Sequence, residues 1–400
     1  MKKTGRDDIL DDVLSIKSNH MVLELPTGTG KTKIALDKTK ALKCKSILIV
    51  VNRNVHKETW SREIDKWWSD CKAKITFTTY VSLHKYAGKY DMCILDEGHH
   101  ISERCARTLP LIDNKYTIIL SATIDRKVRE RLDDIFGSSL YYYSVSLRNA
   151  IDADILPDPN IYLVPLYLRT IGDDELIIKN KKVNKVIECK YKDRWNYLRR
   201  KDIQIRIKCT QSEYYEDLDN QINYWKNRYF NTRSEIAKNK WLKLCSDRLK
   251  WLSDKKTPFV QDILSGLDKH RVLTFCNNIQ QTEDLGEHCI NSKNSDAIEV
   301  LKEFNAGKIN HITACNMLNE GINLNNCQIG IYANLNSSET IIVQRTGRLL
   351  RHKNPIIIIP YYKNTRDEEL VNKMIENYNK DLIVKLNNIQ ELKEVLHKIK

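Results

Sequence analysis

The sequence predicts an α/β protein with two parallel-sheet units and a basic, partly helical segment between them. Short apolar strands alternate with amphipathic helices over residues 1–145, and the same alternation returns from about residue 257. Between these units, residues 210–255 are polar with a helical pattern. A chain of 400 residues also exceeds the size at which single cores stop growing. We therefore expect three parts, at 1–150, 151–256 and 257–400.

The first unit contains five apolar runs that predict buried parallel strands, at 21–25, 46–51, 75–80, 92–97 and 117–123. Residues 54–68 predict a helix whose large apolar side chains fall mostly on one face: Val55, Trp60, Ile64, Trp67 and Trp68. We expect these tryptophans to pack in the core rather than to stack on bases. The proline-marked stretch 152–160 predicts a linker.

The second unit has strand patterns at 271–276, 311–318, 329–335 and 355–362, and residues 366–400 predict one or two amphipathic helices. In the middle segment, 161–168 reads as a strand and 175–201 as a basic hairpin or arm.

The net charge of +14 is unevenly distributed. Lys plus Arg against Asp plus Glu is 26 against 19 over 1–150, 23 against 13 over 160–256, and 17 against 17 over 257–400. The excess in the middle segment predicts a polyanionic partner if those charges share a face. A solvated helical surface would explain the same count.

The composition predicts a cytoplasmic protein without a membrane partner. No run of about 18 apolar residues is present, and the chain start is acidic too early for a signal peptide. The 11 cysteines form no CxxC pair, which is typical of reduced thiols. We expect no zinc site, since His99 and His100 have no further ligand at suitable spacing.

The segment LPTGTGKT (25–32) follows a strand and opens a helix, which predicts a phosphate-binding loop. Gly28 and Gly30 let backbone N–H groups turn onto phosphate oxygens. Lys31 supplies a charge for the β- and γ-phosphates and Thr32 a ligand for Mg²⁺. The strict pattern has Gly where this chain has Leu25, so the match is to a shorter variant.

Two further motifs fit ATP hydrolysis. LDEGHH (95–100) ends a strand, which places Asp96 to hold Mg²⁺ and Glu97 to orient the attacking water. Arg345, Arg348 and Arg351 recur every three residues, so a helix would set them along one face. Such a cluster can stabilise a transferred phosphoryl group. Taken alone, the acidic pair fits a surface turn and the arginines fit a solvated face.

Together and in this order, over residues 20–360, these motifs resemble the superfamily 2 helicases of the DExH type, near the type III restriction and phage repair helicases. LPTGTGKT and LDEGHH resemble motifs I and II, and SAT (121–123) motif III. VVNRNVHKETWSREIDKWW (50–68) resembles the motif Ia region, and TTYVSL (78–83) the segment before motif II. LNEGINL (318–324) resembles motif V and QRTGRLLR (344–351) motif VI. The resemblance implies two RecA-like lobes with ATP between them.

The resemblance also implies roles for individual residues. Arg348 and Arg351 would be the arginine fingers and Gln344 a nearby polar contact. The remaining roles are nucleotide binding by Thr29, Glu320 and Gly321, coupling by His99, Ser121 and Thr123, and strand contact by Thr79 and Tyr80. The chain departs from the family at Gly98, where Ala is common, and at Asn323, where Asp is usual. It also lacks the Gln before the loop that often recognises adenine.

The stretch 179–201 has ten basic residues against two acidic ones, interleaved with aromatic residues. Such a mixture can follow a phosphate backbone and stack on bases. The candidate nucleic-acid contacts here are Lys181, Lys182, Lys185, Arg194 and Trp195. The alternative is a lysine-rich hairpin whose aromatic side chains pack on the lobes.

These observations predict a helicase or translocase that uses ATP and Mg²⁺ to move along a nucleic acid, with DNA favoured over RNA by the resemblance. Two alternatives stay open. The chain could be an ATPase that remodels protein–nucleic acid complexes without unwinding. It could also be an ATP-switched motor subunit with a protein partner, since no nuclease motif is visible.

Overall fold

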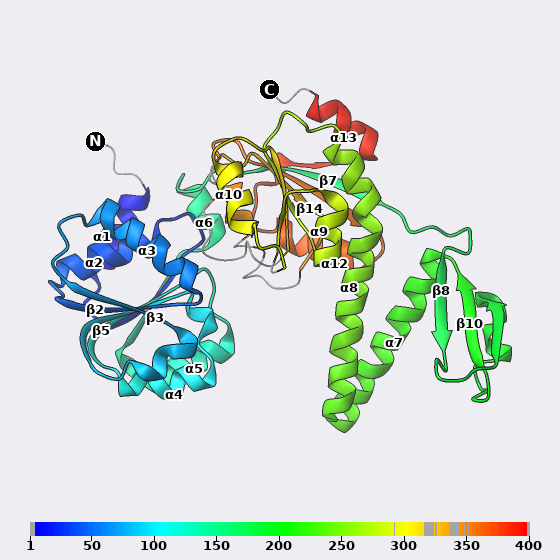
Figure 1. Cartoon of the computed structure of the whole chain (residues 1–400), viewed down its shortest axis with the longest axis horizontal. Helices are drawn as coiled ribbons and strands as arrows, with labels where there is room; N and C mark the ends of the chain where they lie inside the picture. The colour runs from blue at the N-terminus through cyan, green and yellow to red at the C-terminus, as the bar shows by residue number, and fades with distance from the viewer. Residues whose placement is uncertain are drawn as a thin grey trace.

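The computed structural model describes residues 5–291, 293–315, 324, 326–336, 342, 345–347, 349–350 and 352–397, without the side chain of Val55. Two sheet-containing lobes lie next to each other, and a long arm extends from the second lobe (Figure 1). The two-lobed α/β architecture predicted from the sequence is confirmed.

The N-terminal lobe is built on a six-stranded parallel sheet in the order β3-β2-β4-β5-β1-β6. Five of its strands match the predicted runs. They are β1 (His20–Glu24), β2 (Ser46–Val51), β3 (Lys74–Thr79), β4 (Lys89–Asp96) and β5 (Asp113–Ser121). The sixth, β6 (Leu140–Ser144), was not predicted. Its aromatic run pairs with β1 at the edge of the sheet.

Helices cover both faces of this sheet. One apolar cluster joins the sheet to α1 (Gly5–Ser15), α2 (Lys31–Ala41) and α3 (Asn54–Trp67). A second joins it to η1 (Tyr80–Lys85), α4 (Glu103–Thr108) and α5 (Arg126–Phe136). The short turns are η2 (Gly98–His100), η3 (Leu109–Leu111) and η4 (Gly137–Ser139). On α3, Trp60 is fully buried as expected, whereas Trp67 is partly exposed.

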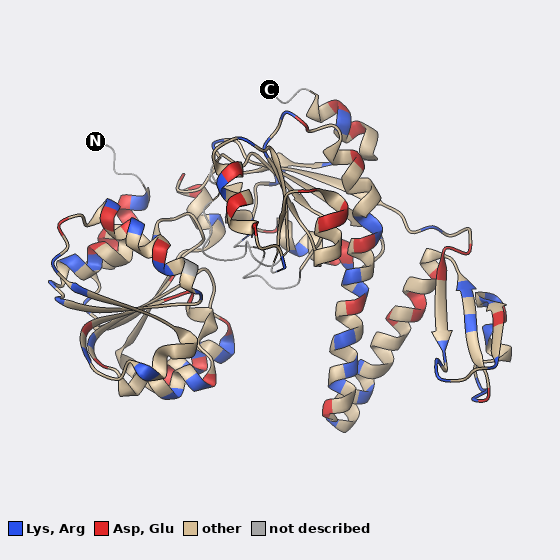
Figure 2. Cartoon of the chain, viewed as in Figure 1, with Lys and Arg blue, Asp and Glu red and all other residues tan. Residues whose placement is uncertain are grey.

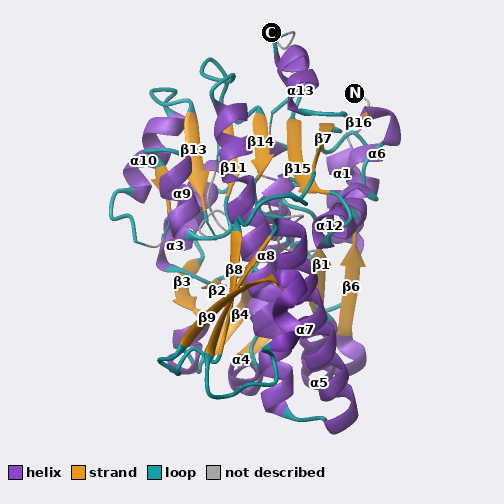
Figure 3. Cartoon of the chain, turned by 90° about the vertical axis from the view of Figure 1, so that its right-hand side faces the viewer, coloured by secondary structure: helices purple, strands orange, loops and turns teal. Residues whose placement is uncertain are grey.

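The C-terminal lobe contains a seven-stranded parallel sheet in the order β12-β13-β11-β14-β15-β7-β16 (Figure 3). Its strands are β7 (Asn160–Leu166), β11 (Val272–Phe275), β12 (Cys289–Ile290), β13 (His311–Ala314), β14 (Ile329–Tyr332), β15 (Ile356–Tyr362) and β16 (Ile383–Lys385). Its helices are α9 (Ile279–Leu285), α10 (Ala297–Asn305), η7 (Lys380–Leu382), and the expected tail helices α12 (Arg366–Ile375) and α13 (Ile389–Leu396). Strand β7 falls inside the expected middle segment, yet it pairs with β15 throughout its length.

The connection between the lobes is packed rather than loose. Helix α6 (Leu147–Asp152) leads into it, and Ile155 and Leu156 are buried in the main apolar cluster. The Arg6 guanidinium donates a 3.1 Å hydrogen bond to Ile155 O. The stretch predicted as a linker therefore lies against the N-terminal lobe.

The arm, residues 175–255, consists of a small sheet and a helical hairpin. The small sheet has the order β8-β10-β9, with β8 (Glu175–Lys179), β9 (Val186–Lys190) and β10 (Gln204–Cys209). The turn η5 (Tyr191–Asn196) follows β9, and β10 then lies between β8 and β9 in the sheet. Of the two expectations for 175–201, a hairpin or an arm, the structure shows the arm. The helical hairpin is α7 (Gln211–Thr232) packed along α8 (Glu235–Leu264).

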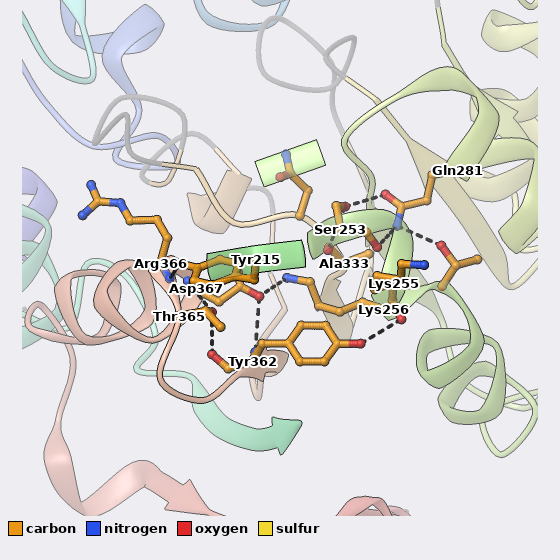
Figure 4. A network of polar contacts seen from close by, with 12 residues as sticks. Tyr215, Ser253, Lys255, Lys256, Gln281, Ala333, Tyr362, Thr365, Arg366 and Asp367 are labelled. Carbon is orange, nitrogen blue, oxygen red and sulfur yellow. Dashed lines mark hydrogen bonds and ion pairs between the residues drawn. The ribbon is translucent and has the colours of Figure 1, made fainter. Parts of the chain in front are cut away.

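Helix α8 continues from the arm into the C-terminal lobe, where polar contacts anchor it (Figure 4). The Lys256 ammonium lies 2.8 Å from the Asp367 carboxylate, and both side chains are almost fully buried. Tyr362 donates from its hydroxyl to Lys255 O at 3.1 Å. Ser253 Oγ lies 2.8 Å from Gln281 Oε1 and 3.0 Å from Ala333 O. The arm is thus fixed to this lobe by buried contacts.

All 11 cysteines are unpaired. Among the described residues, no helix combines the length and apolar character needed to cross a bilayer.

Candidate active site

The turn between β1 and α2 has the backbone conformation of a phosphate cradle. Gly28 and Gly30 have φ of 97° and 94°, in the left-handed region that favours glycine. Thr29 Oγ1 donates to Pro26 O at 2.8 Å and holds the turn closed. Lys31 Nζ donates to Leu25 O at 3.0 Å, so its ammonium lies across the loop. The loop and the first turn of α2 can therefore surround an anion with N–H groups and one cation.

Asp96 ends β4 opposite this loop, and its carboxylate is held from two sides. The Trp60 indole donates to Oδ2 at 2.8 Å, and the Glu97 amide donates to Oδ1 at 3.0 Å. Burial and the adjacent Glu97 raise the pKa of Asp96 to about 6, while the Trp60 hydrogen bond and the charge of Lys31 oppose the rise. A carboxylate in this state is well matched to a cation, which would favour its ionised form.

Glu97 is held in an uncommon backbone conformation. Its φ is 54°, which costs a non-glycine residue energy unless the surroundings enforce it. The residue is only 8% exposed, and Oε2 accepts no hydrogen bond within the described part of the chain. His99 Nδ1 lies 3.5 Å from this oxygen. A buried carboxylate oxygen of this kind can accept a hydrogen bond from an attacking water.

Packing explains why glycine follows this acidic pair. A Cβ at Gly98 would lie 2.4 Å from Ile119 Cγ2 on β5, closer than carbon atoms can approach. The departure from the usual alanine is therefore compatible with this sheet and does not disturb Asp96 or Glu97.

The residues expected to couple the motifs lie together. His99 Nδ1 is 3.2 Å from Ser121 Oγ, and Ser121 Oγ donates to Thr123 O at 2.6 Å. The Leu25 amide donates to Ser121 O at 2.9 Å, which ties the start of the phosphate loop to the same strand end. A displacement of His99, Ser121 or Leu25 would therefore alter the hydrogen bonds of the other two.

A cavity of about 510 Å³ lies over the loop, a size typical of sites for small molecules. It contains the predicted residues Gly28, Lys31, Thr32, Asp96 and Glu97. It is also lined by residues that sequence reasoning did not propose for this site: Arg6, Asp7 and Leu10 from α1, and His56, Thr59, Trp60, Glu63 and Trp67 from α3. The seven-residue spacing of Trp60 and Trp67 indicated a shared helix face, but not a face directed at the loop.

The second lobe contacts the phosphate loop at Thr27, a residue that lines this cavity. A Cβ at Gly347 would lie 2.5 Å from Thr27 Cβ, so the segment 345–347 touches the phosphate loop directly. Arg345 is buried beside it, with its guanidinium 3.3 Å from Asn334 O and over the Phe275 ring. The predicted residues Gln344, Arg348, Arg351, Glu320 and Gly321 lie outside the described residues, as does Asn323.

Two family models match the chain, one over each lobe. The model described as type III restriction enzyme, res subunit, matches residues 7–126, and the helicase conserved C-terminal domain matches residues 255–353. The chain is a superfamily 2 helicase related to the type III restriction enzymes. Membership of this group makes it an ATP-driven nucleic-acid translocase or helicase.

Individual proteins resemble this helicase over most of its length. The DNA 3'-5' translocase XPB2 of Sulfurisphaera tokodaii is 23% identical over 379 residues, which cover 89% of this chain and 80% of that protein. S. cerevisiae Dbp5 bound to RNA and ADP BeF3 has a TM-score of 0.61 at 10% identity, covering 98% and 92% of the two chains. A putative HsdR subunit fragment from Vibrio vulnificus has a TM-score of 0.55 at 16% identity, covering 96% and 66%. These two structures share the fold of the helicase.

The helicase does not present Tyr80 to a nucleic acid, so the prediction of a strand contact there is corrected. Its ring is buried under β4, and its hydroxyl donates to Asp96 O at 2.8 Å. Burial raises the pKa of this hydroxyl well above its usual value. Tyr80 therefore stabilises the backbone of the acidic motif at Asp96. Thr79, at the end of β3, is partly exposed.

The small-sheet cations, which we define as Lys181, Lys182, Lys185 and Arg194, lie on the arm. The three lysines are exposed on the loop between β8 and β9. The Arg194 guanidinium stacks on Tyr191 at 3.5 Å and lies 4.6 Å from the centre of the Trp195 ring. Trp195 is 69% exposed, so its ring is available at the surface. Tyr191 packs in the apolar core of the small sheet. Trp195 lies outside that core.

Proposed function

We propose that this helicase hydrolyses ATP with Mg²⁺ at the interface of its lobes and uses the cycle to move along DNA. The observation that carries the proposal is the contact between Gly347 and Thr27, because it sets the second lobe against the phosphate loop. Opening and closing of this contact would then change with the state of the nucleotide.

The residues around the loop fit a nucleotide with its metal. Glycines at positive φ, the Lys31 ammonium, the Thr32 hydroxyl and the Asp96 carboxylate line one cavity. Thr32 and Asp96 would hold Mg²⁺, which neutralises phosphate charge when bound. Glu97 would orient the attacking water through its buried carboxylate. Thr29, Glu320 and Gly321 would complete the nucleotide contacts.

The second lobe would contribute charge to the reaction. Gln344, Arg348 and Arg351 are neighbours of Gly347 in the sequence, and Gly347 touches the loop. We assign Arg348 and Arg351 as arginine fingers and Gln344 as a polar contact to the phosphates. His99, Ser121 and Thr123 would transmit the state of this site to the sheet.

DNA is the proposed track. The relative from Sulfurisphaera tokodaii is described as a DNA 3'-5' translocase, and the similarity extends over both lobes. The small-sheet cations and Trp195 would add phosphate contacts and a stacking surface, with Thr79 at the edge of the N-terminal lobe.

The test is ATP hydrolysis measured without nucleic acid and then with single-stranded DNA, duplex DNA and RNA of equal length. We expect DNA to stimulate turnover more than RNA. Equal stimulation by RNA would overturn the preference for DNA, and no stimulation by any nucleic acid would overturn the proposed function. Displacement of a bound protein from either end of a single strand would then give the polarity, for which we expect 3' to 5'.

A further inference from the structure

The tip of the helical hairpin, residues 224–243, carries strong unneutralised positive charge. It contains six basic residues (Lys226, Arg228, Arg233, Lys238, Lys240 and Lys243) and one acidic residue, Glu235. Lys238 pairs with Glu235 at 3.2 Å. The other five form no ion pair within the described chain, and all five are exposed. Figure 2 shows these basic residues gathered toward the free end of α7 and α8.

Aromatic rings lie against three of these cations, Arg228, Arg233 and Lys240. Lys240 Nζ lies 4.2 Å from the centre of the Trp225 ring, and the Arg228 guanidinium lies 5.2 Å from it. Tyr229 stacks on Trp241 across the hairpin at 5.9 Å. These three cations are therefore positioned by rings rather than by carboxylates, so their charge stays available to an anion from outside.

The turn of the hairpin adds a second, independent observation. Arg233 caps α7 with φ of 52°, a left-handed conformation in which glycine is the usual residue. Its amide donates to Tyr229 O at 2.7 Å, and its guanidinium lies over Tyr229 and Phe230. Glycine would adopt this turn without strain, whereas arginine keeps a charge at the turn between α7 and α8.

We propose that the tip binds the phosphate backbone of duplex DNA, as a contact separate from the small sheet and from both lobes. This inference rests on the proposed function, since it extends the track of the motor. Cations spread over two packed helices match the repeated charges of a polyanion. Tyr224 and Phe230 stay exposed at the tip, so the choice between duplex and single strand rests on charge. Duplex DNA carries about one negative charge per 1.7 Å of its axis, against about one per 3.4 Å for a single strand, and so offers more phosphates to cations spread over two helices. Duplex is therefore favoured over single strand.

The tip holds its DNA in a fixed relation to the C-terminal lobe. Helix α8 is continuous from Glu235 at the tip to Leu264 in the lobe, a length of about 45 Å. The buried Lys256–Asp367 pair and the Ser253 hydrogen bonds fix its inner end (Figure 4). A duplex bound at the tip would therefore stay attached while the two lobes open and close.

The experiment replaces Lys226, Arg228 and Lys240 together by Gln and measures affinity against salt. Each lost phosphate contact should reduce the logarithmic salt slope on duplex DNA by about 0.9, or about 2.7 for three. Binding to single-stranded DNA should keep its slope. The matched control replaces three exposed lysines of the C-terminal lobe, Lys269, Lys308 and Lys373, by Gln and should leave both slopes unchanged.

A second variant keeps the charge while changing the side chain: Lys226→Arg, Arg228→Lys and Lys240→Arg should retain the duplex slope. If the salt slope on duplex DNA is unchanged in the Gln variant, the proposal is overturned. An acidic protein surface would then be the partner to test for these cations. A loss confined to single-stranded DNA would also overturn it. Failure of the proposed function is a different result, in which no nucleic acid stimulates ATP hydrolysis by the unmodified protein.

Discussion

Alanine at Gly347 should slow ATP hydrolysis without removing ATP from its site. The added Cβ would lie 2.5 Å from Thr27 Cβ and 2.9 Å from Thr27 O. Carbon atoms pack at about 3.5 to 4.0 Å, so the two lobes must separate here by about 1 Å. The backbone of Gly347 is not in the left-handed region, so strain at the new residue is not the cause.

A separation of this size can be translated into a rate. Misplacement by about 1 Å can cost roughly 10²-fold in a reaction that depends on positioning. This equals about 2.7 kcal/mol in the activation barrier. Binding of ATP should change much less, since the loop, Lys31 and Asp96 all belong to the N-terminal lobe. Alanine also has the higher helix propensity, so the variant should stay folded.

The assay compares steady-state ATP hydrolysis at saturating DNA with nucleotide binding measured by titration. Gly266→Ala is the matched control, because its Cβ would meet Ile263 O at an ordinary 3.6 Å. Turnover in Gly347→Ala equal to that of the control would refute the reasoning. It would mean that the contact with Thr27 is not formed in the catalytic cycle.

The remaining perturbations address three separate parts of the molecule. Lys31→Ala should weaken ATP binding, because it removes the charge that contacts the phosphates. Glu97→Gln should leave ATP binding intact and stall turnover. Full turnover by the Glu97→Gln protein would show that Glu97 does not orient the attacking water. Replacing the small-sheet cations by Gln should flatten the slope of log affinity against log salt on single-stranded DNA by roughly 3. Trp195→Ala should cost about 1 to 3 kcal/mol of binding free energy and leave that slope unchanged. Asp367→Asn should lower the free energy of unfolding by about 3 to 5 kcal/mol in urea titration, because it leaves the Lys256 ammonium buried without a counter-charge. Glu235→Gln, at an exposed pair, should barely move the midpoint.

Local sequence patterns were sufficient for much of the ATP site. The loop residues 25–32 are contiguous, and Asp96 and Glu97 sit at a strand end that the apolar run 92–95 indicates. Parallel strands place their carboxyl ends on one edge of a sheet, so these two segments had to meet there. Periodicity also predicted that Trp60 is buried. It could not indicate that the indole N–H would meet the Asp96 carboxylate at 2.8 Å, because that depends on how α3 is set against β4.

Contacts between distant segments were beyond the sequence patterns. The run at 161–168 was identified as a strand, but its partner β15 is almost 200 residues away, and nothing local specifies that pairing. The segment 175–201 was expected to form a hairpin or an arm, and the hairpin does not form because β10, from beyond this segment, lies between β8 and β9. Tyr80 was expected to face a nucleic acid, but η1 begins at this residue and turns its side chain under Asp96.

The anchoring of α8 connects the arm to the predicted arginine motif. Ser253 on α8 bonds to Ala333 O, and the next residue, Asn334, accepts from the guanidinium of Arg345. Arg345 lies two residues from Gly347, which touches the phosphate loop. Three contacts therefore connect the arm to the ATP site: Ser253 with Ala333, Arg345 with Asn334, and Gly347 with Thr27. Because this region is packed, a displacement of the arm would displace the phosphate loop as well. DNA held at the tip and ATP held at the loop would, on this arrangement, each restrict the same segment of the second lobe.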